Sequence, residues 1–180
     1  MPRSTEPNAP VIVIDLQTLM FKADPPLWDA AGLEGRVREV IAWARRSGRK
    51  VAFVRHNGVP PEPIARGGWG WPVWPGLGQA EDEPTFEKTV GDSFSNQDLV
   101  DWVRAQGAGE VILLGAQTDQ CVAESTKGAL ERGLAVTVVA DAHSTWDWNG
   151  ETAPQIIDRL NARFAEGGAR VVPLATLTAA

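Results

Sequence analysis

The chain has 180 residues, of which 43% are apolar and 22% charged, as expected for one globular domain with a single core. Its net charge of −6 and scattered basic residues argue against a nucleic-acid-binding protein, which usually carries a basic face. No apolar run reaches the roughly 20 residues that span a bilayer, and the start MPRSTEPNAP lacks the apolar core of a secretory signal. We therefore expect a cytoplasmic protein without nucleic-acid or membrane partners, with a mobile tail at residues 1–9 and one domain at 10–180.

The first third of the chain predicts a strand–helix–strand unit. Residues 11–15 (VIVID) and 50–54 (KVAFV) are short runs rich in β-branched residues, which are typical of buried strands. Residues 34–47 place Val37, Val40, Ile41 and Ala44 at helical spacing, and Gly48 ends that helix. Because the strands are apolar throughout, they indicate a parallel sheet covered on both faces.

A long loop at residues 55–83 follows, rich in Gly and Pro. Its three tryptophans, Trp69, Trp71 and Trp74, argue for an ordered loop that folds over a functional site. The next predicted elements are a strand at 84–90, a helix at 96–104 capped by Ser95, and a strand at 110–115. A helix at 120–132 capped by Thr118 or Asp119, a strand at 134–140, a helix at 152–166 and a strand at 169–173 complete the chain. The sum is an α/β domain with a doubly wound sheet of about six strands.

Three chemically distinct side chains lie at the predicted strand ends. Asp15 closes the first strand, Lys88 lies near the end of the third, and Cys121, the single cysteine, follows the fourth. Right-handed crossovers bring the carboxyl ends of such strands to one crevice, where ligands bind. There the helix tip and Lys88 would favour a thiolate, Asp15 would move the proton, and backbone N–H groups of Gln117 and Cys121 would hold an oxyanion.

Each residue also has a plainer interpretation. In that interpretation Asp15 caps a turn, Lys88 is solvated and Cys121 packs in the core. A haloacid-dehalogenase-like phosphatase with Asp15 as nucleophile is disfavoured, because Gln17 stands where that chemistry needs a second aspartate. A redox sensor would need a thiol from another molecule, since the chain has no second cysteine.

Three segments resemble the isochorismatase-like cysteine hydrolases: VIVIDLQ at 11–17, FEKTVGDSF at 86–94 and GAQTDQCVAESTKGALERGLAVTVVADAHST at 115–145. The resemblance extends over most of residues 11–173, and the segment around the cysteine is its most specific part. It implies three layers with a sheet of six parallel strands in the order 3-2-1-4-5-6. It also implies a triad of Asp15, Lys88 and Cys121, and a cis peptide at Ala116–Gln117.

The chain departs from the nicotinamidases of that family. Their metal site has an Asp-x-His pattern after the second strand, but Val54 stands two residues before His56, and His143 lies after the fifth strand. We therefore expect no catalytic metal and no cofactor. Because the cysteine is kept, the resemblance favours amide or ureide cleavage of a small molecule through a thioester. The alternatives are a hydrolase of a non-amide substrate and a non-catalytic binding module. Family members commonly form dimers or tetramers, so we expect a homodimer or homotetramer.

Residues around the triad are candidates for the substrate pocket. The loop at 66–76 supplies Trp69, Trp71 and Trp74 as a pocket wall, with packing of the loop or a subunit interface as the alternative. Trp146 and Trp148 follow the fifth strand and reach the same face. Gln17 and His56 follow the first two strands, and Arg55 or Arg66 could recognise a carboxylate. The predicted pocket residues are therefore Gln17, His56, Trp69, Trp71, Trp74 and Trp146.

Overall fold

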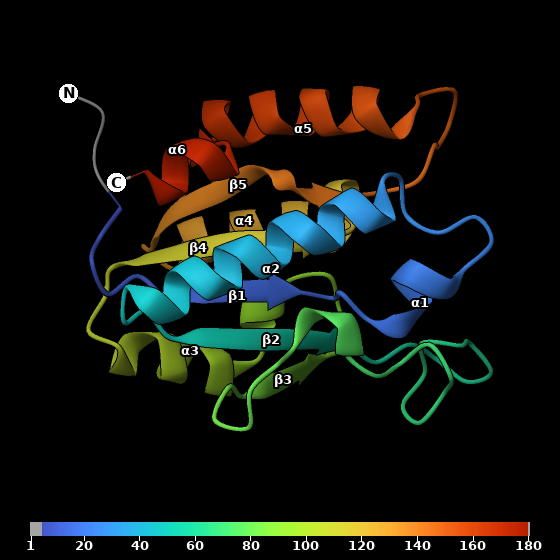
Figure 1. Ribbon diagram of the computed structural model, residues 1–180, viewed down its shortest axis with the longest axis horizontal. Coiled ribbons are helices and arrows are strands. Elements are labelled where there is room, and N and C mark those ends of the chain that lie inside the picture. The colour runs from blue at the N-terminus through green and yellow to red at the C-terminus, as the bar shows by residue number, and fades with distance from the viewer. Residues whose placement is uncertain (1–4, 180) are drawn as a thin grey trace.

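The computed structural model describes residues 5–179, which build a three-layer α/β structure around one sheet (Figure 1). The sheet has six strands in the order β3-β2-β1-β4-β5-β6, and every neighbouring pair is parallel. The predicted fold class and strand order are confirmed. The strands are β1 (Val11–Ile14), β2 (Val51–His56), β3 (Thr85–Lys88), β4 (Glu110–Ala116), β5 (Ala135–Ser144) and β6 (Arg170–Val172).

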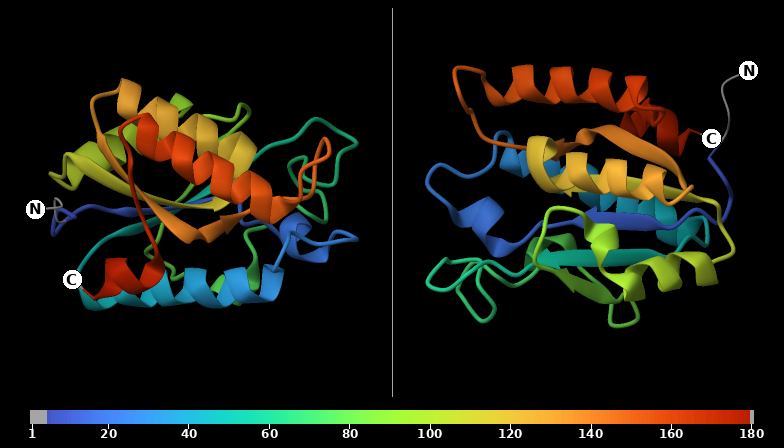
Figure 2. Two further views of the ribbon diagram at one scale, coloured as in Figure 1. Left: turned by 90° about the horizontal axis from the view of Figure 1, so that it is seen from above. Right: turned by 180° about the vertical axis from the view of Figure 1, so that it is seen from behind.

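Helices cover both faces of this sheet. One face carries α2 (Ala30–Arg46) and α6 (Leu174–Thr178), and the other carries α3 (Gln97–Ala105), α4 (Ala123–Glu131) and α5 (Ala153–Glu166) (Figure 2). A short helix α1 (Thr18–Lys22), two 3-10 turns, η1 (Pro75–Leu77) and η2 (Ser93–Ser95), and a π-helical turn η3 (Thr118–Val122) lie in the connections. Among residues 5–179, no helix is long and apolar enough to cross a membrane.

Alternation along the central strands divides the core between the two helical layers. On β1, Val11 and Val13 pack in the cluster with α2, whereas Ile12 and Ile14 pack in the cluster with α3, α4 and α5. All four side chains are buried, because successive residues of a strand point to opposite faces. This explains why the strand is apolar at every position up to Asp15.

Several predicted boundaries differ from the structure for local reasons. The α2 helix begins earlier, at Ala30, and β2 and β5 run on to His56 and Ser144. Asn96, not Ser95, caps α3: its side chain accepts the N–H of Asp98. The hydroxyl of Ser95 is already engaged, since it donates to the carbonyl of Asp92.

The helix after β4 also begins differently from the prediction. Neither Thr118 nor Asp119 acts as its cap, because the chain first makes the π turn η3, and α4 starts only at Ala123. No side-chain cap is present at the start of either element.

The predicted tail is described only in part. Residues 1–4 lie outside the described residues. At residues 5–9, Ala9 is buried, Glu6 N–H donates to Glu110, and the carboxylate of Glu6 accepts the N–H of Gly109. These contacts hold residues 5–9 against the start of β4.

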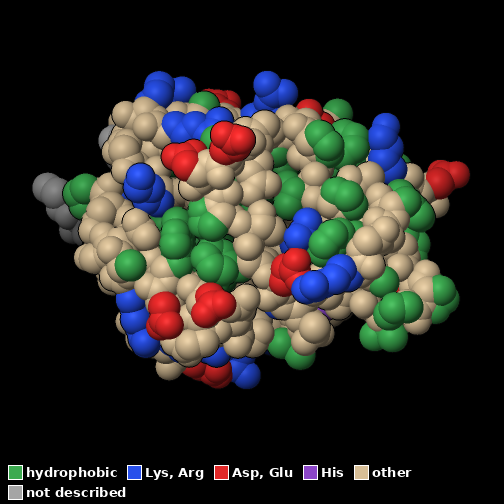
Figure 3. Space-filling view, turned by 90° about the horizontal axis from the view of Figure 1, so that it is seen from below, with side chains coloured by type: hydrophobic (Ala, Val, Ile, Leu, Met, Phe, Trp, Pro, Cys, Tyr) green, Lys and Arg blue, Asp and Glu red, His purple; other side chains and the backbone are tan. Residues whose placement is uncertain are grey.

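The β3 edge of the sheet carries mixed charge. Arg55 on β2 donates to Glu87 on β3 at 2.8 Å, and Arg66 from the following loop pairs with the same carboxylate. Seen from below in Figure 3, Lys and Arg side chains lie among Asp and Glu side chains and do not gather in one patch. Charged side chains on an edge strand discourage pairing with a strand of another molecule.

Gly115 allows β4 to approach β1 closely at the level where Asp15 leaves the sheet. It pairs with Ile14 and has a φ of 135°, a region that side chains other than glycine rarely adopt. A Cβ atom at this position would lie 2.0 Å from the carbonyl oxygen of Ile14. Glycine is therefore required here by both backbone conformation and space.

We expect Gly115→Ala to lower the free energy of unfolding by about 3 kcal/mol or more, because overpacking and backbone strain act together. Gly35→Ala is the matched control, since a Cβ at Gly35 in α2 meets nothing within 4 Å. That control should raise stability by roughly 0.5–1 kcal/mol through helix propensity. Urea unfolding measures both, and equal effects of the two substitutions would contradict this account.

Candidate active site

The candidate site lies where the strand order reverses. Asp15 follows β1 and Cys121 follows β4, and these neighbouring strands are connected to opposite edges of the sheet. Loops leave such a pair in opposite directions, which opens a crevice at the carboxyl ends of the strands. Asp15 has a φ of 51°, so the chain turns sharply as it leaves β1, in a conformation that aspartate tolerates better than most residues.

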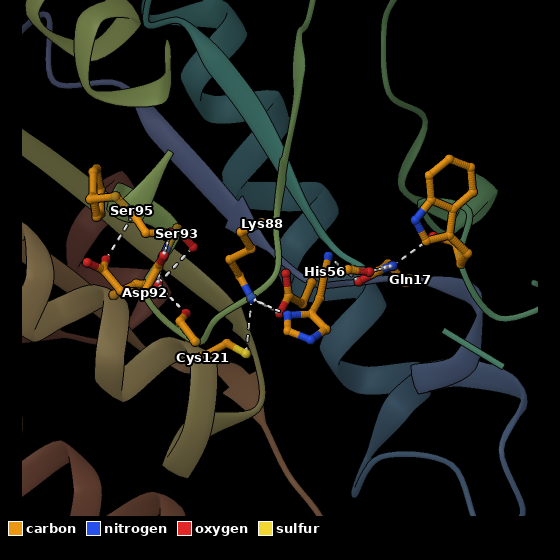
Figure 4. A network of polar contacts seen from close by, with 12 residues as sticks. Gln17, His56, Lys88, Asp92, Ser93, Ser95 and Cys121 are labelled. Carbon is orange, nitrogen blue, oxygen red and sulfur yellow. Dashed lines mark hydrogen bonds and ion pairs between the residues drawn. The ribbon is translucent and has the colours of Figure 1, made fainter. Parts of the chain in front are cut away.

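The structure brings Asp15, Lys88 and Cys121 into contact through the ammonium group of Lys88. Figure 4 shows Lys88 directed toward Cys121 and His56. Lys88 Nζ lies 2.8 Å from Asp15 Oδ2 and 3.2 Å from Cys121 Sγ. A third neighbour, His56 Nδ1, lies 2.9 Å away. Lys88 and His56 are register partners on β3 and β2, so their side chains leave the sheet at the same level.

These contacts define the protonation pattern around Lys88. An ammonium group has three hydrogens, and here it faces a carboxylate oxygen, an imidazole nitrogen and a sulfur. His56 Nδ1 must then accept, which places the imidazole proton on Nε2. Burial and the charge of Lys88 lower the pKa of His56, which favours this neutral form.

Burial shifts the two partners of Lys88 in the same direction. Desolvation raises the pKa of Asp15, although Lys88 and hydrogen bonds oppose it. Burial, then the charge of Asp15, raises the pKa of Cys121 to about 12, and Lys88 does not offset this. The expectation of a resting thiolate at a helix tip is therefore wrong: the sulfur lies in the π turn before α4 and is a thiol at neutral pH.

The turn that carries Cys121 is held by backbone and side-chain contacts at its first residues. The Ala116–Gln117 peptide bond is cis, and the carbonyl of Gln117 accepts the N–H groups of Gln120 and Val122. The hydroxyl of Thr118 lies 2.8 Å from His143 Nδ1, and this contact is buried.

His143 is itself held by α5, since its Nε2 lies 2.9 Å from Asn161 Oδ1. Burial lowers the pKa of His143 to about 4, so the ring is neutral at physiological pH. His143 therefore occupies a buried place between α5 and the turn that carries Cys121.

A cavity of about 660 Å³ leads to the sulfur. Among the predicted site residues, Asp15, Cys121, Gln117, His56 and Trp146 line it, and so does Trp148. Residues that the sequence did not single out complete the wall, and most follow a strand end or belong to the turn and helix after β4. They are Leu19, Met20, Glu62, Pro63, Ile64, Gly91, Asp119, Gln120, Glu124, Thr145 and Asp147.

The three loop tryptophans lie outside the cavity lining, contrary to the prediction. The guanidinium carbon of Arg55 lies 3.6 Å from the ring centroid of Trp71 and stacks on that ring. Trp74 stacks on Phe21, with the two ring centroids 5.0 Å apart. Trp69 is 56% exposed. The alternative interpretation, that these rings pack the loop itself, describes Trp71, whereas Trp74 packs against α1 and donates to Glu34 on α2.

Gln17 also takes a structural place instead of lining the cavity. Its side-chain amide donates to the carbonyls of His56 and Trp71 and accepts the N–H of His56. It therefore connects the first strand end to the second and to the loop. Arg55 and Arg66, considered as carboxylate receptors, are both paired with Glu87 and lie outside the lining.

One group within residues 5–179 has the ligand types of a metal site. The ligand atoms of Asp15, His56 and Cys121 lie within 4.8 Å of one another. Lys88 Nζ contacts all three at 2.8–3.2 Å, so the lysine ammonium holds the position that a metal cation would need. The residues therefore fit a charge-neutralising lysine better than a metal ion.

Comparison with known proteins finds a matching family model and curated relatives. A family model described as the isochorismatase domain matches residues 9–169. Two streptothricin hydrolases of Streptomyces noursei are 31% identical over 163 residues and 29% identical over 167. These matches cover 88% and 91% of this chain but 57% and 64% of the relatives, so the chain spans under two thirds of their length.

Solved structures share the fold over nearly the whole chain. An isochorismatase structure from Pseudomonas putida KT2440 has a TM-score of 0.90 and 27% identity, covering 98% of this chain and 93% of that one. A cysteine hydrolase structure from Pseudomonas syringae pv. phaseolicola 1448A has a TM-score of 0.88, covering 98% and 94% of the two chains. At 19% identity, the second likeness shows the fold alone.

The raised pKa of Cys121 predicts how the free protein reacts with iodoacetamide. The rate constant should rise about tenfold per pH unit from about pH 7 to about pH 10 without a plateau, since the thiolate fraction grows in this way below the pKa. Asp15→Asn removes a negative charge beside the sulfur, so at about pH 8 it should react severalfold faster than the native protein. Asp98→Asn on α3 is the exposed control; a plateau below about pH 9 in the native protein would contradict the prediction.

The lowered pKa of His143 predicts a loss of stability in acid. The unfolded chain binds a proton at this residue below about pH 6.5, whereas the folded protein does so only below about pH 4. Stability is therefore full above the unfolded pKa and is lost as pH falls, by about 3 kcal/mol at most from this group. In urea unfolding at a series of pH values, His143→Gln should lose less stability than the native protein between these limits. Equal losses would count against a buried neutral His143.

Proposed function

The chain belongs to the isochorismatase family, and we propose that it is a small-molecule hydrolase that cleaves an amide or ureide C–N bond through Cys121. The observation that carries this proposal is the contact of one buried ammonium with both a carboxylate and a thiol at the floor of a cavity. The names of the two streptothricin hydrolases support a hydrolytic function.

The first half of the reaction forms a thioester. Asp15 removes the proton of Cys121 as the sulfur attacks the substrate carbonyl, so a C–S bond forms and the carbonyl oxygen becomes an oxyanion. Backbone N–H groups of Gln117 and Cys121, two residues that line the cavity, are the proposed donors to this oxygen. Protonated Asp15 then gives the proton to the leaving nitrogen as the C–N bond breaks.

The second half restores the enzyme with one water molecule. Asp15 removes a proton from water, the hydroxyl adds to the thioester carbonyl, and the C–S bond breaks. The sulfur then recovers its proton from Asp15. The products are a carboxylic acid and an amine or ammonia. The net reaction is therefore hydrolysis of one amide bond by one water molecule.

Lys88 acts in this cycle without exchanging its proton. Negative charge moves from Asp15 to the sulfur and back, and Nζ contacts both groups. The ammonium therefore stabilises the charge in either place, while the burial that raises the pKa of Asp15 makes that carboxylate a stronger base.

A hydrolysis screen of ureides, carbamoyl compounds and aryl amides tests the proposal. Cys121→Ala and Cys121→Ser should each lower kcat by about 10³-fold or more on any amide that the native protein cleaves, because both lack the thiol nucleophile. Rapid acid quench and mass spectrometry should show the acyl group on Cys121 of the native protein during turnover.

Ser47→Ala is the control for these variants, because Ser47 bonds only to backbone carbonyls at the end of α2 and lies outside the cavity lining. It should keep full activity. Hydrolysis that survives both substitutions of Cys121 would end the thioester mechanism.

A further inference from the structure

The cavity that leads to Cys121 is acidic. Besides Asp15, which is paired with Lys88, its lining includes Glu62, Asp119, Glu124 and Asp147. No lysine or arginine belongs to the lining among the described residues. Glu62, Glu124 and Asp147 are exposed and Asp119 is half-buried, whereas Asp15 is buried, so these carboxylates lie between solvent and the nucleophile.

Neutral groups, and not cations, hold these carboxylates in place. Glu62 accepts the N–H of Val59, Asp119 accepts the hydroxyl of Thr145 at 2.7 Å, and Asp147 accepts the N–H of Ala153 at the start of α5. Within residues 5–179, none of the four carboxylates lies within 4.0 Å of a lysine or arginine nitrogen. Asp119 interacts with Arg159, the partner of Glu151, only beyond that distance. The negative charge of Glu62, Glu124 and Asp147 is therefore directed by the fold but not neutralised by an ion pair.

Glu124 occupies space that a glycine leaves free. A Cβ atom on Gly91 would lie 1.1 Å from Glu124 Oε2, so any larger residue at 91 would displace this carboxylate. The negative charge of Glu62 and Glu124 also acts at the floor of the cavity. Both carboxylates raise the pKa of His56, although burial lowers it more.

Two indole rings accompany the carboxylates. Trp146 is fixed by donation from its Nε1 to the carbonyl of Pro25 at 2.9 Å, and Trp148 is 71% exposed. The face of an indole attracts cations, more strongly than other aromatic rings do. Carboxylates and indoles around one cavity favour a positively charged ligand and repel an anion.

We propose that the substrate is a cationic amide, with an ammonium or guanidinium group on the part of the molecule that extends from the scissile carbonyl toward Glu62, Glu124 and Asp147. This inference rests on the proposed function, because it takes the cavity as the substrate site. Asp15 and Cys121 act on the carbonyl, and the acidic lining selects among amides by charge.

The single cysteine allows a direct test of the charge in the cavity. Cys121 is treated with 2-(trimethylammonio)ethyl methanethiosulfonate or with the anionic 2-sulfonatoethyl reagent. Each forms a mixed disulfide and releases methanesulfinate. The rate of each reaction, followed by the mass of the whole protein, is divided by the rate of the same reagent with the uncharged thiol 2-mercaptoethanol. We expect the cationic reagent to be favoured about tenfold or more at low salt, and less at about 0.5 M salt.

The preference should fall about tenfold in the triple variant Glu62→Gln/Glu124→Gln/Asp147→Asn. If that variant does not fold, Glu124→Gln alone serves as the test, and it should lower the preference two- to threefold. Glu39→Gln, an exposed position on α2 outside the lining, should leave it unchanged. A ratio near one in the native protein, or a ratio that survives these substitutions, would overturn the cationic substrate and leave thioester hydrolysis standing. Failure of both reagents to modify Cys121 even at about pH 10, where the thiolate fraction is far larger than at neutral pH, would overturn both proposals, since the cavity would not reach the sulfur.

Discussion

The arrangement depends on one buried ammonium. The side chains of Lys88 and Asp15 are almost completely inaccessible to water, so each charge is tolerable only because the other lies 2.8 Å away. His56 and Cys121 accept the two remaining hydrogens of Lys88, which leaves this cation fully hydrogen-bonded in the interior. These contacts connect the ends of β1, β2 and β3 to the turn after β4, and they explain why polar groups are buried among apolar strands.

The same burial sets the chemistry of the site. It makes Asp15 a stronger base and Cys121 a weaker acid, so the proton stays on sulfur in the free protein. In the proposed mechanism, proton transfer is then favourable only when the sulfur begins to bond to a carbonyl carbon and its charge passes on to the substrate oxygen. A thiol that is protonated at rest is also less open to oxidation, which is useful for a lone cysteine without a resolving partner.

Local patterns predicted the doubly wound sheet of about six strands and the meeting of Asp15, Lys88 and Cys121, whereas the strand order came from the resemblance to the isochorismatase-like hydrolases. β-branched runs mark strands, and the ends of parallel strands share one edge. The packing of the Trp71 and Trp74 rings could not be predicted from local patterns. It depends on Arg55, Phe21 and other partners far away in the chain, and composition does not show which face of a loop turns inward. The sign of the Cys121 pKa shift was missed for a related reason, since burial is a property of the folded chain.

In the proposed reaction, catalysis and substrate selection are supplied by different segments. The reacting groups come from the ends of β1, β3 and β4, where register and hydrogen bonds leave little freedom. The acidic residues come from the loop after β2, from the turn and helix after β4, and from the segment after β5, as Glu62, Glu124 and Asp147 illustrate. A change in these exposed segments alters the charge that the cavity accepts without moving Lys88 from its three partners. Substrate preference in such a fold can therefore diverge while the chemistry at the sulfur is retained.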